Sequence, residues 1–319
     1  MSFEMNIIWA IILLAGGLVI LWKCAELLVA GAVGLAEKLG VSPLVIGLTI
    51  VAMGTSAPEV AASIAAAVRG AGDVAIGNVY GSNIANLALV GGLCALIRPI
   101  KVQLRALQRE IPVMLLVALL LWPVLHNLYL SRPEGIALLG VFAALMLLTV
   151  YLARKEEYKS TSAQERKSAR TQRNVFFVVI GLAGLALGAD MTVRGAVFIG
   201  ERAGLSNAVI GLTIIAIGTS LPELATCVAA AVKKQDDISI GIMVGSNIFN
   251  ALLAIGVAGM IRPFEVVSRL AGVDYWIMVI ISAGFAGAAL IGRRVGRADG
   301  TLLLCGYIGY IVYLFAYSR

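Results

Sequence analysis

Two short motifs in this chain place a carboxylate beside a helix-breaking proline within apolar sequence. They are Gly54–Glu59 (GTSAPE) and Gly218–Glu223 (GTSLPE). A proline inside a helix has no N–H to donate, so the carbonyl four residues earlier, here of Gly54 or Gly218, loses its usual partner. In lipid, such a break persists only where it lines a polar cavity or binds something. The two motifs therefore predict an ion site.

The side chains of these motifs offer the oxygen atoms that bind hard cations. Besides its glutamate, each motif contributes two hydroxyl groups, from Thr55 and Ser56 and from Thr219 and Ser220. Carboxylates, hydroxyls and freed carbonyls suit sodium, calcium or magnesium, and neither motif contains a cysteine or histidine that would favour a softer metal. We therefore expect a hard-cation site that contains Glu59 and Glu223.

The composition is that of a membrane protein with many spans. The chain has 319 residues, of which 60% are hydrophobic and 13% are charged, and its mean hydropathy is +0.96. A soluble chain of this size carries about 25% charged residues. We expect an all-α fold with ten transmembrane helices, at roughly 6–36, 42–69, 73–97, 107–128, 134–153, 174–200, 206–232, 237–261, 270–292 and 299–317.

Basic residues are distributed unevenly between the two sides of these spans. The loops after the odd-numbered spans hold 17 Lys and Arg residues, whereas the opposite side, which includes both termini, holds 6. The positive-inside rule then predicts a plasma (inner) membrane protein with both termini outside and the linker 154–173 in the cytoplasm. The net charge of +7 reflects this topology, so membrane lipid is the expected environment and no nucleic-acid partner is indicated.

The two motifs belong to an internal duplication. Residues 40–99 align with 204–263 without a gap, and 32 of the 60 positions are identical. Five spans separate equivalent points, and because five is odd, the second copy enters the membrane from the opposite face. We therefore expect two inverted five-helix repeats, at 1–153 and 174–319. Their broken helices 2 and 7 should meet near the midplane, so that the two glutamates share one site.

A second motif also occurs twice. Gly81–Asn86 (GSNIAN) recurs as Gly245–Asn250 (GSNIFN). The serine and the last asparagine are four residues apart and so lie on one helical face. The middle amides, Asn83 and Asn247, are more simply explained as bonds between helices. We expect the other four polar side chains to line the ion site, namely Ser82, Asn86, Ser246 and Asn250.

Together these features resemble the sodium/calcium exchanger family of calcium/cation antiporters, in its compact prokaryotic form. The resemblance rests on the two copies of each motif and on ten spans arranged five plus five. It implies a secondary transporter, not an enzyme, that exchanges sodium for calcium at one cluster of four ion sites without a cofactor. Asn250 departs from the pattern, because many prokaryotic and potassium-dependent relatives have aspartate there. Potassium dependence is therefore not expected.

The resemblance also implies roles for individual residues. The calcium shell would combine two shared carboxylates with two backbone oxygens, those of Glu59, Glu223, Thr55 and Thr219. The flanking sodium sites would draw on three residues from each half, Ala52, Ser56 and Ser82 and their counterparts Ala216, Ser220 and Ser246. Asn86 and Asn250 would complete the centre.

The charge of such a site can be counted from its residues. Two carboxylates in a low-dielectric cavity repel each other, so protons should compete with cations. One calcium ion or two sodium ions neutralise the pair, and a third sodium ion would make each cycle move net charge. We expect electrogenic alternating access that weakens at acid pH. The alternatives are an antiporter of the same fold that couples calcium or another divalent ion to protons, and an intramembrane hydrolase with the glutamates as acid and base.

Four further charged residues fall within expected spans. Lys23 and Glu26 are three residues apart, and Asp190 and Arg194 are four apart, so each pair could form along one helical face. Either these pairs stabilise long tilted helices, or they take part in gating.

Overall fold

The computed structural model describes residues 6–155, 169–204 and 216–317. Within these ranges, eight helices are long and apolar enough to cross a membrane, and a ninth span results if the pair Pro43–Thr55 and Ala57–Val68, bent by 45°, counts as one. A shorter apolar helix, Leu221–Val232, ends the expected span 206–232, whose residues 206–215 lie outside the described part of the chain. The all-helical membrane fold is confirmed for the described residues.

The first half consists of helices interrupted by short π-helical turns, labelled η, and by two short strands. Its elements are α1 (Ile7–Leu39), α2 (Pro43–Ile46), η1 (Gly47–Val51), α3 (Ala52–Thr55), α4 (Ala57–Val68), α5 (Gly72–Ile84), η2 (Ala85–Val90), α6 (Gly91–Ile97), β1 (Ile100–Lys101), η3 (Ala106–Glu110), α7 (Ile111–Leu125), β2 (Tyr129–Leu130) and α8 (Arg132–Lys155). The Asn6 side chain caps the start of α1 by accepting from the Trp9 N–H at 3.0 Å. Gly40, with φ of 69°, ends the helix in the left-handed conformation that glycine adopts without strain.

The second half repeats this order of elements. It contains α9 (Ala169–Arg202), α11 (Ala216–Thr219), α12 (Leu221–Val232), α13 (Asp236–Phe249), η5 (Asn250–Ala254), α14 (Ile255–Ile261), β3 (Phe264–Glu265), η6 (Leu270–Asp274), α15 (Tyr275–Leu290), β4 (Arg294–Val295) and α16 (Arg297–Tyr317). The span formed by α13, η5 and α14 is the most buried, with 89% of its apolar window inside the protein. It forms the centre of the bundle.

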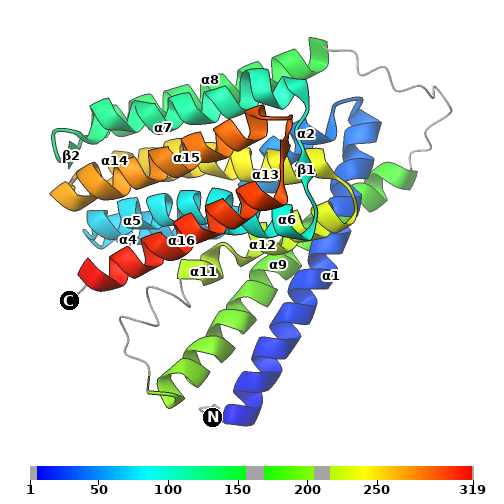
Figure 1. Ribbon diagram of the computed structural model, residues 1–319, viewed down its shortest axis with the longest axis horizontal. Helices are drawn as coiled ribbons and strands as arrows, with labels where there is room; N and C mark the ends of the chain where they lie inside the picture. The colour runs from blue at the N-terminus through cyan, green and yellow to red at the C-terminus, as the bar shows by residue number, and fades with distance from the viewer. Residues whose placement is uncertain (1–5, 156–168, 205–215, 318–319) are drawn as a thin grey trace.

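The two longest helices lie across the rest of the bundle. Figure 1 shows α7, α8, α13, α15 and α16 running side by side, while α1 and α9 run together at a steep angle to them. Glycines allow α1 and α9 to approach closely: a Cβ added at Gly195 would lie 2.6 Å from the Ala10 carbonyl oxygen, and one at Gly17 would lie 2.7 Å from that of Gly188. Such contact between backbones is typical of small-residue interfaces in membranes.

Charged residues within α1 and α9 form the expected ion pairs. The Lys23 Nζ lies 3.3 Å from Glu26 Oε2, and the Arg194 Nε lies 2.8 Å from Asp190 Oδ2. Both pairs join side chains on one face of a single helix, as their spacing predicts.

Two short antiparallel strand pairs join the halves at the ends of the spans. Ile100 and Lys101 of β1 pair with Val295 and Arg294 of β4, and Tyr129 and Leu130 of β2 pair with Glu265 and Phe264 of β3. β1 and β2 belong to the first half and β3 and β4 to the second, so each pair takes one strand from each half. The duplication makes β1 equivalent to β3. The sequence did not predict these strands, because two residues are too few to show a strand periodicity.

The expected linker is helical at both ends. α8 continues to Lys155 and α9 begins at Ala169, so the helices extend beyond the limits set by hydropathy at 153 and 174. Hydropathy marks where a helix leaves the hydrocarbon, but Lys, Arg and Glu are good helix formers and allow it to continue into water. The remainder of the linker, 156–168, lies outside the described residues.

Candidate ion-binding site

The two predicted helix breaks are present, and each occurs at the motif serine. α3 ends before Ser56 (φ −83°, ψ 3°) and α12 begins after Ser220 (φ −87°, ψ 6°). Pro58 and Pro222 lie in the first turn of the helix that follows, where the missing N–H leaves no helical bond unmade. In both motifs the second helix begins one residue before the proline.

The two motifs meet at these breaks. The Ser56 hydroxyl donates to Glu223 Oε1 at 2.8 Å, although the two residues are 167 positions apart in sequence. The Ser246 hydroxyl lies 3.4 Å from the same oxygen. Since Glu59 lies in the first turn of α4, three residues after Ser56, these contacts bring both glutamates to the junction of the two broken helices.

Both carboxylates are enclosed by protein. Glu59 is 0% exposed and Glu223 is 1% exposed. Among the described residues, no Lys or Arg forms an ion pair with either of them. Buried acidic residues are almost always paired with an opposite charge or a metal ion. The site therefore has the charge and the burial expected for binding cations.

Buried polar atoms without a hydrogen-bond partner gather at the same place. Folded proteins pair nearly all such atoms, so a cluster of exceptions requires an explanation. All but one of those near the glutamates are oxygens, and a hard cation would coordinate them. They are Glu59 Oε1 and Oε2, Glu223 Oε2, Asn86 Oδ1, Asn250 Oδ1 and Nδ2, and Ser220 Oγ.

The two asparagines predicted to line the site lie in π-helical turns. Asn86 is the second residue of η2, and Asn250 is the first residue of η5. Both are 0% exposed. A π-turn inserts an extra residue into a helical turn and is frequent at functional sites. Helix propensity does not reveal such turns, and they were not predicted.

The remaining amides join the two halves, as expected. The Asn83 side chain donates to the Asn247 carbonyl, and the Asn247 side chain donates to the Asn83 carbonyl, each at 3.3 Å. Asn86 also donates to Asn247 Oδ1 at 3.3 Å. The bonding of helices predicted for Asn83 and Asn247 is confirmed.

The other predicted residues lie around this centre. Ala52, Thr55 and Ser82 are buried, and Ala216 is the first residue of α11. The Thr55 hydroxyl donates to the Val51 and Ala52 carbonyls at 3.1 and 3.3 Å. Because this hydroxyl is bonded within its own helix, Thr55 is better placed to offer its backbone oxygen than its side chain.

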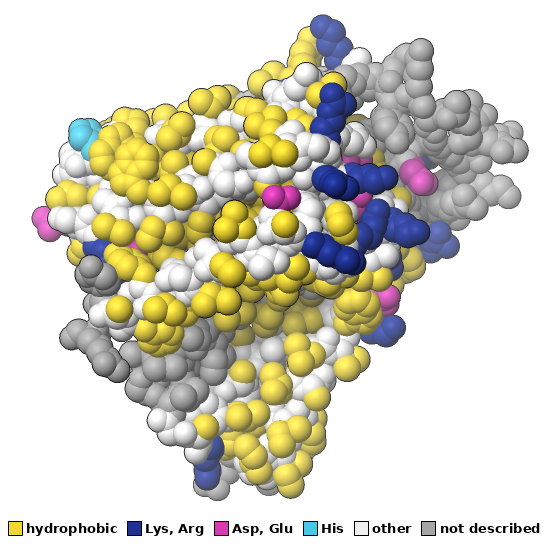
Figure 2. Space-filling view, viewed as in Figure 1, with side chains coloured by type: hydrophobic (Ala, Val, Ile, Leu, Met, Phe, Trp, Pro, Cys, Tyr) yellow, Lys and Arg dark blue, Asp and Glu magenta, His cyan; other side chains and the backbone are white. Residues whose placement is uncertain are grey.

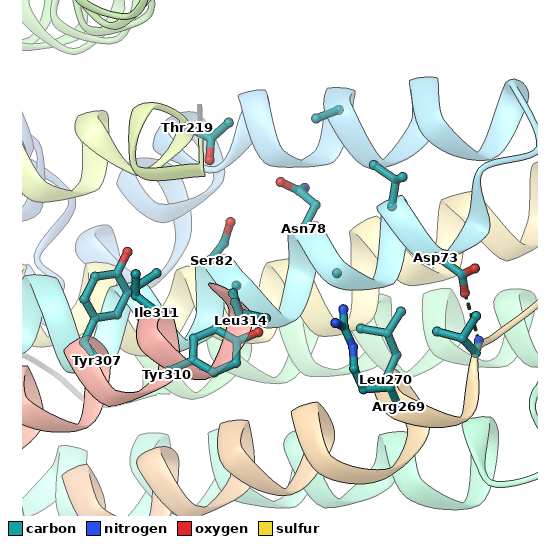
Figure 3. Close-up of a pocket in the computed structure, with 15 residues that line it drawn as sticks. Asp73, Asn78, Ser82, Thr219, Arg269, Leu270, Tyr307, Tyr310, Ile311 and Leu314 are labelled. Carbon is teal, nitrogen blue, oxygen red and sulfur yellow. Dashed lines mark hydrogen bonds between the residues drawn. The ribbon is translucent and has the colours of Figure 1, made fainter. Parts of the chain in front are cut away.

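A cavity of about 520 Å³ reaches the site from one end of the bundle. Figure 3 shows Ser82 and Thr219 at its inner end, and Asp73 and Arg269 toward its other end. Residues of α16, including Tyr307, form the opposite wall. Two of the predicted ligands thus border a space large enough for hydrated ions.

Asn78 supports the site but was not predicted from the sequence. The Asn78 side chain donates to the Glu59 carbonyl at 3.0 Å and to the Ser63 hydroxyl at 2.9 Å, and so ties α5 to α4. The equivalent residue in the second half is Ile242, and there the Ser239 hydroxyl donates to the Cys227 carbonyl at 3.1 Å instead. The available signal was an amide one turn before Ser82 in an otherwise apolar span.

Comparisons with known proteins show the family of this chain. The family described as sodium/calcium exchanger protein matches residues 9–151 and 173–316. The chain is 41% identical to the putative antiporter CaxA of Alkalimonas amylolytica, over 94% of this chain and 97% of that protein. It is 33% identical to the sodium/calcium exchanger MaX1 of Methanosarcina acetivorans, over 94% and 96% of the two chains.

A solved structure shares the fold along nearly the whole length. The sodium-calcium exchanger NCX_Mj, soaked with zero Na⁺ and Ca²⁺, matches with a TM-score of 0.85 at 31% identity, and the match covers 97% of this chain and 100% of that one. The protein described here belongs to the sodium/calcium exchanger family.

Proposed function

We propose that this protein is a secondary active antiporter that exchanges sodium for calcium by alternating access. The observation that supports this most directly is the cluster of buried, unpartnered oxygens that both halves contribute around Glu59 and Glu223. Members of the family are ion transporters and not enzymes, so the intramembrane hydrolase is no longer an alternative. Beyond the family, we propose that the coupled ion is sodium and not a proton.

The proposed ligands follow the two-fold repetition of the motifs. Glu59 and Glu223 would bind both ions, and the Thr55 and Thr219 carbonyls would complete the calcium shell. Asn86 and Asn250 would lie at the centre, where their side-chain oxygens have no protein partner. The flanking sodium sites would use Ala52, Ser56 and Ser82 on one side and Ala216, Ser220 and Ser246 on the other.

An inverted repeat is the proposed architecture, with halves at 1–153 and 174–319. The reciprocal bonds between Asn83 and Asn247 support it, because equivalent residues that bond each other in the same way must lie beside a local two-fold axis. The two strand pairs, each with one strand from each half, support the same relation. Both termini would lie outside and the linker 154–173 in the cytoplasm.

Sodium-driven calcium uptake is the test of this function. Proteoliposomes loaded with sodium and diluted into sodium-free buffer should accumulate calcium, because outward sodium flow drives the exchange. A matched set loaded with potassium, and one held under a pH gradient alone, should accumulate little. Equal uptake driven by the proton gradient alone would indicate that protons, and not sodium, are the coupled ion. Uptake independent of any counter-gradient would contradict antiport itself.

The exchange should also respond to membrane potential. If three sodium ions leave for each calcium ion that enters, one positive charge moves out per cycle, which is worth about 2.3 kcal/mol per 100 mV. Uptake into sodium-loaded vesicles should therefore accelerate at inside-positive and slow at inside-negative potentials, imposed with potassium and valinomycin. An uptake rate that does not change with membrane potential would contradict net charge movement but would be compatible with electroneutral antiport.

A further inference from the structure

A group of exposed basic residues surrounds the β1–β4 strand pair at one end of the bundle. We call it the basic rim and define it as Lys101, Arg293, Arg294 and Arg297, all of which are exposed. Figure 2 shows Lys and Arg side chains gathered at this end of the protein, where Figure 1 labels β1. The positive-inside rule accounts for the sign of these charges but not for their mutual arrangement.

Two of the rim residues face each other across the strand pair. Lys101 is directly opposite Arg294 in the β1–β4 register, and like charges in this position destabilise a pair of strands. In the β2–β3 pair at the other end, Glu265 occupies the position equivalent to Lys101 and faces Tyr129. The fold therefore does not require two cationic side chains at this position. A bound anion between them would relieve their repulsion.

Three carboxylates near the strand pair accept hydrogen bonds from groups other than the rim side chains. Asp236 accepts from the Arg98 side chain at 3.0 Å and from the Lys101 backbone N–H at 3.3 Å. Asp237 accepts from Gln103 at 2.6 Å, and Asp299 accepts from the Gly296 backbone N–H at 2.8 Å. Among the described residues, no ion pair joins a rim side chain to a carboxylate. The four rim side chains therefore have no carboxylate paired with them among the described residues.

Exposed apolar side chains lie next to the rim. Leu290 and Ile291, three and two residues before Arg293, are 61% and 81% exposed, and Ile97 and Leu104, on either side of β1, are each 47% exposed. Four of the membrane-length helices begin or end here, at Ile97, Ala106, Leu290 and Arg297. The rim therefore lies at the boundary between hydrocarbon and headgroups, where an apolar surface continues directly into a basic one.

We propose that the basic rim binds the phosphate of an anionic phospholipid, with the acyl chains of the lipid on the exposed apolar residues beside it. A phosphate between Lys101 and Arg294 removes the repulsion between these side chains. Arginine can hold it with two parallel hydrogen bonds, which lysine cannot, and Lys101 adds a point charge. The bound lipid would hold β1 to β4, and thus the first half of the chain to the second.

The test uses the full-length protein purified in detergent and titrated with dioleoyl phosphatidylglycerol, with bound lipid counted by native mass spectrometry. Dioleoyl phosphatidylcholine and inorganic phosphate serve as parallel ligands. The test variant is Lys101→Gln with Arg294→Gln, and the charge-preserving variant is Lys101→Arg with Arg294→Lys. The matched control, Arg69→Gln with Arg132→Gln, removes the same charge from exposed residues elsewhere.

We expect the wild type, the charge-preserving variant and the control to retain phosphatidylglycerol in preference to phosphatidylcholine. The test variant should bind it about 25-fold more weakly, a factor of about five for each basic residue lost near an anionic lipid. Equal retention by the test variant and the control would overturn the proposal. The proposal would also be overturned if inorganic phosphate at matched ionic strength displaced the lipid, because that result would indicate a site for free anions. Size exclusion and thermal unfolding in mixed micelles of detergent and phosphatidylcholine verify that each variant is folded, and transport activity is not needed for any of these readouts.

Discussion

Replacing either Glu59 or Glu223 by glutamine is expected to abolish sodium-driven calcium uptake, with a loss of at least about 100-fold. Glutamine keeps the shape of the side chain but removes one of the two negative charges that face the ion. A unit charge about 4 Å from another is worth about 4 kcal/mol at an effective dielectric constant of 20, and the interaction doubles for a divalent ion. Even if desolvation offsets half of the interaction with calcium, about 4 kcal/mol remains, which exceeds the about 2.8 kcal/mol that a 100-fold loss requires. The measurement is initial calcium uptake into sodium-loaded proteoliposomes.

The matched control is Glu26→Gln, which also neutralises a glutamate within a long apolar helix. The Glu26 carboxylate is paired with Lys23 and lies outside the oxygen cluster, so its loss should only reduce the rate. Equal losses in Glu26→Gln and in the two site variants would contradict the assignment of Glu59 and Glu223 as the ion ligands. Full activity of Glu59→Gln would contradict the shared site directly.

Valine in place of Gly245 is expected to prevent assembly of the site. A Cβ at this position would lie 2.5 Å from the Leu48 carbonyl oxygen and 2.7 Å from the Ala52 side chain. Both contacts are with the first broken helix, and the next residue, Ser246, lies within reach of Glu223. Overpacking of a tight interface typically costs about 1–3 kcal/mol, and here a backbone atom must also move. We expect a lower melting temperature and a loss of uptake of at least about tenfold.

Gly284→Val serves as the control for this prediction. Gly284 lies in α15, and no described atom lies within 4 Å of a Cβ added there. This variant adds the same side chain to a membrane helix without a clash, so its melting temperature and its uptake should remain close to those of the wild type. If Gly245→Val behaved like the control, the close approach of α13 to the broken helix would not be needed for transport.

The sequence by itself determined the features that depend on local chemistry. Pro58 and Pro222 each lie in the first turn of a helix, because a proline lacks the N–H that an interior position must donate but that a first-turn position does not. The gapless duplication predicted that the two breaks are equivalent, and the carboxylate beside each proline predicted a cation site. For these reasons the predicted meeting of the two motifs agrees with the bond from Ser56 to Glu223.

Only the tertiary structure decided which neighbours each repeated residue receives. Glu223 accepts from Ser56 and Ser246, whereas the Glu59 side chain has no hydrogen-bond partner among the described residues and its backbone is held by Asn78. The π-turns at Asn86 and Asn250 were likewise not predicted. The physical reason is that hydropathy and proline chemistry act along the chain, while hydrogen-bond partners come from other helices that only folding brings close, as Ser56 and Ser246 are brought to Glu223.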